Sequence, residues 1–191
     1  MNAGFQPHPE QRGITLTEVM VVVAIIGILA GLAVPSFQDM LERNRLKQVA
    51  EALKSDMLYA RAEAIKRSQN IVVSRSPGNA GAWCYGININ SHCDCTTVGS
   101  CAIKTVSGSE FSAAVDMIAA TISNDSTFDF RRGTVVADTF IFNSSHYSVA
   151  VTTIVSDNSV AGKVAAGQTA SGQVILCTPV GSTGISSYPP C

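Results

Sequence analysis

Residues 14–38 of the chain read ITLTEVMVVVAIIGILAGLAVPSFQ, and the character of this stretch sets the fold class. No side chain from Val19 to Gln38 is charged. At about 1.5 Å of rise per residue these positions form a helix roughly 30 Å long, which matches the hydrocarbon core of a bilayer. One carboxylate, Glu18, lies at the amino-terminal end, and an ionisable group at the edge of a membrane span needs a partner. The stretch therefore predicts a transmembrane helix with a functional acid at its start.

The composition of all 191 residues narrows the class further. With 13 basic and 14 acidic residues the formal net charge is -1, which excludes a strongly basic protein that holds nucleic acid by bulk electrostatics. Hydrophobic residues make up 46% and charged ones 14%, so the chain is not intrinsically disordered. The length allows one globular domain with appendages.

Two general interpretations of the apolar stretch fit poorly. A removable secretory signal would have its small-residue cleavage site at residues 31–33, but the polar residues before the stretch and Glu18 are atypical of such a signal. An ordinary signal anchor would follow the positive-inside rule, and the basic residues lie mainly after the stretch (Arg12 before it; Arg43, Arg45 and Lys47 after it). That bias would place the carboxyl-terminal part in the cytoplasm, whereas six cysteines favour an oxidising compartment.

A third interpretation removes this conflict. Residues 12–18, RGITLTE, with the apolar run after them, resemble the prepilin signature of type IV pilins and type II secretion pseudopilins. The resemblance implies that a prepilin peptidase cuts between Gly13 and Ile14 on the cytoplasmic side and then methylates the new amino group of Ile14. It makes Glu18 the fifth residue of the mature chain, where the family keeps a glutamate, and Pro35 a helix-bending proline. Ile14 departs from the phenylalanine that is usual at the first mature position.

The same resemblance gives Glu18 a role in assembly. A buried carboxylate costs free energy unless a cation lies near it. In the family that cation is the amino group of the first mature residue, here Ile14, on a neighbouring subunit, and the pairing sets the register of assembly. The alternative is a plain helix-start acid, which the helix dipole favours and whose removal would have only a small effect.

The chain divides into four parts. Residues 1–13 are a polar leader peptide, 14–38 the transmembrane or filament-core half of a long helix, 39–68 its amphipathic half, and 69–191 a β-rich head. In the amphipathic half an apolar stripe recurs at three- and four-residue steps and is expected to pack on a sheet, at Leu46, Val49, Leu53, Met57, Ala60 and Ala64. We interpret the i, i+4 charge pairs on the other faces mainly as a solvated surface; they are Asp39/Arg43, Lys47/Glu51 and Glu63/Arg67.

From about residue 70, short strand-like runs alternate with turn clusters. The runs cover residues 71–73, 85–89, 102–106, 127–130, 139–142, 147–155 and 173–177. Residues 155–172 show weak periodicity and are expected to form a mobile loop. The expected fold class is α+β, the pilin fold, in which a long N-terminal helix packs on a C-terminal antiparallel β-rich head.

A second resemblance narrows the family. Residues 59–67, YARAEAIKR, with the run at 71–73, are similar to the helix end and first strand of the GspH/FimT family, which includes type II secretion pseudopilin H and the type IV pilus minor pilins FimT and FimU. Trp83, residues 128–133 (FDFRRG) and the last strand with its short extension to Cys191 are also similar. The resemblance implies a minor subunit that initiates or caps assembly of a type IV pilus or a type II secretion pseudopilus.

The implied surroundings follow from the family. The partners would be other minor and major pilins or pseudopilins, the prepilin peptidase and the inner membrane. The chain would cross the inner membrane once with its head in the periplasm, and would then enter the pilus or pseudopilus and reach the cell surface. A stand-alone membrane-anchored binding module is the alternative from another class.

A further alternative is a DNA-binding minor pilin for natural transformation. Some FimT relatives bind DNA through a Gly-Arg-x-Arg motif after the last strand, and the matching place here, residues 181–184, reads GSTG without a cation. Over residues 76–191, four basic residues face seven acidic ones. Because phosphate contacts need lysine or arginine, we expect no direct DNA binding, with Arg131 and Arg132 as the remaining candidate or as a solvated turn.

The six cysteines predict disulfides in an oxidising compartment. Cys177 and Cys191 lie far from the others and are expected to pair, closing a loop of about 15 residues. Cys84, Cys93, Cys95 and Cys101 leave three connectivities open, although Cys93 and Cys95, which one residue separates, are poorly placed to join each other. A metal site with His92 is the alternative, but the spacing matches no structural zinc module.

Enzymatic chemistry has little support in the sequence. The chain has three histidines, His8 in the leader, His92 among cysteines and His146 beside a strand-like run. No glycine-rich phosphate loop or nucleophile elbow is present. We therefore expect no enzyme, no cofactor and no metal.

Overall fold

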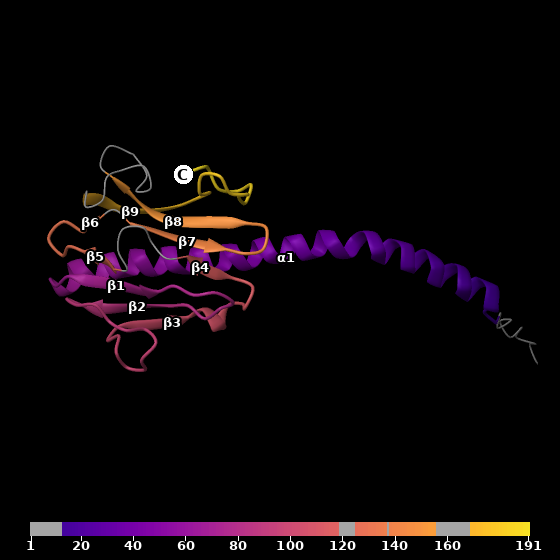
Figure 1. Ribbon diagram of the computed structural model, residues 1–191, viewed down its shortest axis with the longest axis horizontal. Helices are drawn as coiled ribbons and strands as arrows, with labels where there is room; N and C mark the ends of the chain where they lie inside the picture. The colour runs from indigo at the N-terminus through magenta and orange to yellow at the C-terminus, as the bar shows by residue number, and fades with distance from the viewer. Residues whose placement is uncertain (1–12, 119–124, 137, 156–168) are drawn as a thin grey trace, which may run out of the picture. The chain divides into compact units, whose positions relative to one another are not determined.

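The computed structural model describes residues 13–118, 125–136, 138–155 and 169–191 (Figure 1). The chain forms two compact units, Met1–Met40 and Leu41–Cys191. The boundary between them lies two residues after the predicted end of the transmembrane half.

One helix, α1 (Leu16–Arg67), contributes to both units. In the first unit its apolar side chains are exposed, and among the described residues α1 is the one helix long and apolar enough to cross a membrane. The helix continues through Pro35 without interruption. An exposed apolar surface of this length is stable only in a non-aqueous environment or against other apolar helices.

In the second unit, α1 turns an apolar stripe toward the sheet. All six predicted stripe residues are fully buried, and Ala50 joins them. The predicted stripe is therefore confirmed. It forms one side of the core, and aromatic side chains from the strands form the other: Trp83, Phe128, Phe140 and Phe142.

Within the described residues, nine strands form one antiparallel sheet of order β3-β2-β1-β5-β6-β9-β8-β7-β4. The strands are β1 (Ile71–Ser76), β2 (Cys84–Ile89), β3 (Lys104–Ser107), β4 (Asp116–Ile118), β5 (Asp125–Phe128), β6 (Val135–Val136), β7 (Thr139–Asn143), β8 (Ser148–Val155) and β9 (Thr169–Cys177). A short 3₁₀ helix, η1 (Gly108–Glu110), follows β3. The expected α+β fold, with a long helix and an antiparallel head, is confirmed.

The sheet curls back on itself. Its middle strand β6 has only two residues. Gly78, just after β1, exchanges backbone hydrogen bonds of 3.1 and 3.0 Å with Met117 of the edge strand β4, although β1 and β4 stand far apart in the strand order. The head therefore consists of two half-sheets, β3-β2-β1-β5 and β9-β8-β7-β4, joined through β6 and brought together again at Gly78.

The strand boundaries differ from the prediction at several places. The sequence pattern missed β4 and β6, which are too short to show a period of two. The expected loop at 155–172 was wrong at its end, because residues 169–172 belong to β9. Residues 156–168 of that expected loop lie outside the described residues.

The interpretation of the helix charges as a solvated surface was wrong for several of them. Glu63 is buried, and its carboxylate accepts hydrogen bonds from Arg67 and, at 3.3 Å, from Lys66. Lys47 donates instead to Ser187 Oγ (3.1 Å), and Arg43 donates to the hydroxyl of Tyr147 (2.6 Å). The Glu63 contacts lie within the helix, whereas Lys47 and Arg43 attach the helix to loops of the head.

Candidate functional site

The predicted processing motif lies at the start of α1. Gly13 and Ile14 precede the helix, and Ile14 is 77% exposed. Thr15 is the N-cap: its hydroxyl accepts a hydrogen bond from the backbone N–H of Glu18 (3.3 Å), and its carbonyl accepts one from Val19 (3.2 Å). The Gly13–Ile14 peptide bond therefore lies in exposed backbone outside the helix, where a peptidase could reach it.

Glu18 lies in the first turn of α1 with its side chain exposed. No hydrogen bond or ion pair joins its carboxylate to any residue in the described part of the chain. The helix dipole stabilises an acid at this position. The carboxylate is thus held at the helix start and is available to a cation outside the chain.

Three disulfides join the cysteines of the head, all six of which lie in described segments. Cys177 is bonded to Cys191, the pair expected from the sequence. The structure chooses one of the three open connectivities for the rest, Cys84–Cys95 and Cys93–Cys101. Both of these bonds fasten the loop between β2 and β3. His92, the residue considered for a metal site, contacts Asp125 at 2.8 Å.

The C-terminal loop, residues 178–191, folds onto the head. Its ends are joined by backbone hydrogen bonds that Thr178 donates to Pro189 (2.7 Å) and Cys191 donates to Thr178 (2.8 Å). Tyr188 donates to the Glu51 carboxylate on α1 (3.1 Å), and burial together with this carboxylate raises the pKa of Tyr188 to about 12. The GSTG sequence at residues 181–184 therefore belongs to a docked loop, and residues 178–191 contain no lysine or arginine.

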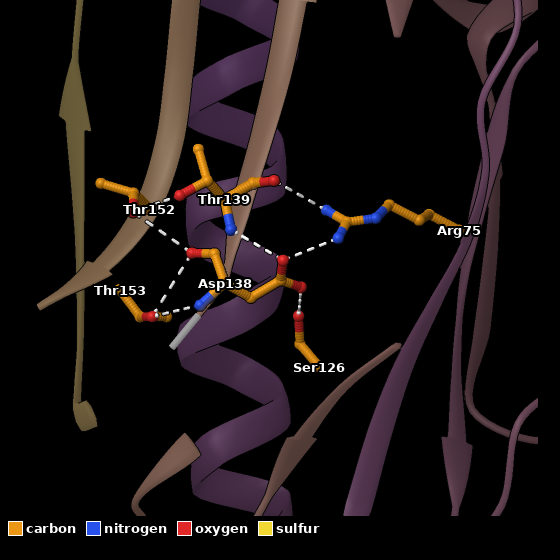
Figure 2. A network of polar contacts seen from close by, with 6 residues as sticks. All are labelled: Arg75, Ser126, Asp138, Thr139, Thr152 and Thr153. Atoms are coloured by element: carbon orange, nitrogen blue, oxygen red, sulfur yellow. Dashed lines mark hydrogen bonds and ion pairs between the residues drawn. The ribbon is translucent and has the colours of Figure 1, made fainter. Parts of the chain in front are cut away.

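A buried polar network, which the sequence analysis missed, joins the two half-sheets (Figure 2). Arg75, at the end of β1, donates to Asp138 Oδ1 (2.7 Å) and to the carbonyl of Thr139 (3.0 Å). Ser126 of β5 donates to the other carboxylate oxygen of Asp138. The guanidinium also lies 4.0 Å from the centre of the Phe140 ring.

The backbone at Asp138 is held as firmly as its side chain. Its N–H donates to the hydroxyl of Thr153 (3.0 Å), and its carbonyl accepts from the N–H of Thr153 (3.1 Å) and the hydroxyl of Thr152 (3.2 Å). Burial raises the pKa of Asp138, and Arg75 opposes this without cancelling it. An arginine two residues after the apolar run Ile71–Val73 was the sequence signal that could have indicated this network.

Two further contacts anchor α1 to the head. Asp56 accepts from the Tyr85 hydroxyl (2.8 Å) and from Lys104 Nζ (2.7 Å), and burial, then the Asp56 charge, raises the pKa of Tyr85. Nearer the start of the head, Glu42 contacts the backbone N–H of His146 (2.8 Å) and its Nδ1 (3.0 Å). These side chains fix which face of the helix meets the sheet.

The two adjacent arginines of the sequence analysis lie in the β5–β6 turn. Asp129 Oδ1 accepts from the backbone N–H groups of Arg131 (2.7 Å) and Arg132 (3.1 Å). Gly133, at φ +61°, closes the turn against α1, where an added Cβ would lie 2.9 Å from Nε of Arg61. Beside the turn is a pocket of about 460 Å³, lined by Asn70, Thr127, Asp129, Arg131, Arg132, Thr134 and Val135.

Comparison with known proteins agrees with this architecture. Residues 49–159 match the profile of a family described as Type II transport protein GspH, and residues 9–34 match the Prokaryotic N-terminal methylation motif. No solved structure matches.

Several curated relatives are pilins. A "Fimbrial protein" of Pseudomonas aeruginosa is 42% identical over 67 residues, 35% of this chain and 43% of that protein. A "Pilin-like protein" of Thermus thermophilus is 34% identical over 43% of this chain and 51% of that protein. A "Type IV major fimbrial protein" of Dichelobacter nodosus is 51% identical over 20% of this chain and 25% of that protein. The similarity thus spans about half of these relatives or less.

Proposed function

Because this chain belongs to the family described as Type II transport protein GspH, whose members are pilin-like structural proteins, we propose that it is a minor pilin or pseudopilin that initiates or caps assembly of a type IV pilus or a type II secretion pseudopilus. One observation carries the proposal. An uninterrupted helix, α1, is fully exposed and apolar in its first half and forms the core of a folded head in its second half. Such a helix suits a subunit that leaves the membrane to enter a helical bundle.

The outward face of α1 within the head supports the same function. Four exposed residues follow one another on this face at three- and four-residue steps, namely Ser55, Leu58, Ala62 and Ile65, and Leu58 and Ile65 are 42% and 53% exposed. Small and apolar residues at this spacing let two helices approach closely. This face would contact the helices of neighbouring subunits.

The role of a minor subunit is supported by the share of the chain that each comparison matches. The GspH profile covers most of the head, residues 49–159. The three curated relatives named above match no more than 43% of the chain. This difference in coverage supports the proposal of a minor subunit.

Maturation and location complete the proposal. The prepilin peptidase would cut between Gly13 and Ile14 and methylate Ile14, and the chain would wait in the inner membrane with its head in the periplasm. During assembly, the carboxylate of Glu18 would pair with the amino group of Ile14 on a neighbouring subunit. The apolar surroundings would make this pair strong, because a carboxylate without a cation is costly there.

The test combines the mass of the mature protein with its incorporation into filaments. We expect a chain that begins at N-methylated Ile14, and we expect Glu18→Ala and Glu18→Gln to insert in the membrane but to enter filaments poorly. Thr17→Ala, in the same helical turn, is the matched control and should assemble normally. Retention of residues 1–13, a cut after Ala33, or normal incorporation of both Glu18 variants would contradict the proposal.

A further inference from the structure

The pocket beside the β5–β6 turn has an excess of positive charge that the proposed assembly through α1 does not use. Its two guanidinium groups, from Arg131 and Arg132, form no ion pair with any carboxylate in the described segments. The one acid of the lining, Asp129, already accepts two backbone N–H groups through Oδ1. The lining therefore has two positive side chains and one negative side chain, so the pocket carries a net positive charge.

The rest of the lining provides hydrogen-bonding groups and one apolar wall. Thr127 and Thr134 bring hydroxyls, Asn70 brings an amide, and Val135 is apolar. Asn70 also fixes the turn, because its Oδ1 accepts from the N–H of Phe130 (3.3 Å). The site is therefore assembled from Asn70, which lies between α1 and β1, and from both arms of the turn.

The geometry points to a carboxylate as the ligand: we propose that this pocket binds an acidic side chain or the carboxyl terminus of a neighbouring pilin subunit. Guanidinium groups bind carboxylates through two parallel hydrogen bonds. A pocket of about 460 Å³ has room for one such side chain. The inference rests on the proposed function only in taking the partner to be another pilin.

The surroundings favour a protein over nucleic acid. Four other cations of the head are already in ion pairs, namely Lys66 and Arg67 with Glu63, Arg75 with Asp138, and Lys104 with Asp56. Binding of a DNA duplex depends on many contacts between cations and phosphates. The two arginines of the pocket are too few for this. Apolar groups lie close instead: Ile65 is 53% exposed, and its Cδ1 lies 3.1 Å from where a Cβ on Gly133 would be. Arginine beside apolar surface is typical of protein interfaces.

The experiment titrates the processed, full-length chain in detergent micelles and follows the arginine Nε–Hε signals by NMR. The probes are a decapeptide of alternating Glu and Gly, its Gln–Gly counterpart, and a short DNA duplex. We expect the Glu peptide to shift the Arg131 and Arg132 signals saturably and the Gln peptide to leave them unchanged. Arg131→Gln with Arg132→Gln should weaken Glu-peptide binding by about ten- to a hundred-fold, since charged hydrogen bonds are lost.

Two controls keep the result interpretable. Arg45→Gln removes an exposed arginine of α1 outside the pocket and should leave the titration unchanged. Arg131→Lys keeps the charge but loses the two-pronged geometry, so it should weaken binding less than the double variant. Thermal unfolding of every variant checks that it is folded.

Several outcomes would overturn the inference. Equal binding of the Glu and Gln peptides, or equal binding by the double variant, would show that the pocket takes no carboxylate. Duplex binding that is tighter than Glu-peptide binding and is lost in the double variant would assign the pocket to nucleic acid. Because the titration needs no filament, its failure leaves assembly through Glu18 untouched, and the Glu18 test can fail without affecting it.

Discussion

Replacing Arg75 by methionine should remove the main link between the two half-sheets. The side chains of Arg75 and Asp138 are 0% and 3% exposed, and Nη2 lies 2.7 Å from Oδ1. Removing one partner of such a buried pair costs about 3–5 kcal/mol, because the other charge is left buried. Ser126 and the N–H of Thr139 still bond Asp138 in the variant, so we expect a loss near the lower limit, about 3 kcal/mol.

The stability of the variant should also depend on pH more strongly than that of the wild type. Burial raises the pKa of Asp138 even in the wild type, and the variant lacks Arg75, the cation that opposes this rise. The folded variant then keeps a proton that the unfolded chain releases above about pH 4. The free energy of unfolding should therefore fall as the pH rises from about 4 to the raised pKa, by up to about 1.4 kcal/mol per pH unit.

The assay is urea unfolding of residues 41–191, the compact unit that contains the whole described core, with its disulfides intact, at a series of pH values. Arg75→Met with Asp138→Leu removes both charges and should recover most of the loss, because an apolar pair of similar size replaces a buried ion pair at little cost. Arg45→Met is the exposed control. A loss below about 1 kcal/mol for Arg75→Met, with the same pH dependence as the wild type, would refute the reasoning.

Two further predictions concern the attachments of the head. Hydrogen bonds from Ser144 and His146 outweigh burial and hold the pKa of Glu42 below its usual value. This contact therefore stabilises the loop between β7 and β8 above pH 4.5, and it is lost as the pH falls through the lowered pKa. The protection of the backbone amides of this loop against hydrogen exchange should therefore drop in acid in the wild type. In Glu42→Gln this protection should be low and independent of pH. Replacing Cys177 and Cys191 together by serine should lower the free energy of unfolding by about 3 kcal/mol in urea, as expected for a loop of about 15 residues; an unchanged midpoint would contradict this.

The long helix and its division into a membrane half and an amphipathic half could be predicted, because their sequence signals are local. The charge-free run before residue 39 and the stripe from Leu46 to Ala64 depend only on composition and helical period, and the structure reproduces both. β6 has no such signal, since two residues show no alternation. Its place in the sheet depends on β5 and β9, which lie far away in the chain.

The candidate sites also differ in whether a local sequence signal predicts them. Gly13, Ile14 and Glu18 are recognisable because spacing alone defines the processing motif. Arg75 and Asp138 are 63 residues apart, and they meet only because the curled sheet brings β1 to the start of β7. The pairing of the clustered cysteines likewise depends on how the loop after β2 is folded.

Because β9 is the last strand of the chain and lies between β6 and β8, the sheet stays open until synthesis has delivered residue 177. By then the whole of α1 has left the ribosome. The stripe from Leu46 to Ala64 therefore stays partly uncovered until β9 arrives, because β9 completes the sheet on which the stripe packs. A chain that stops before β9 would lack the strand that joins β6 to β8, and it would leave apolar surface of the helix and of the strands exposed.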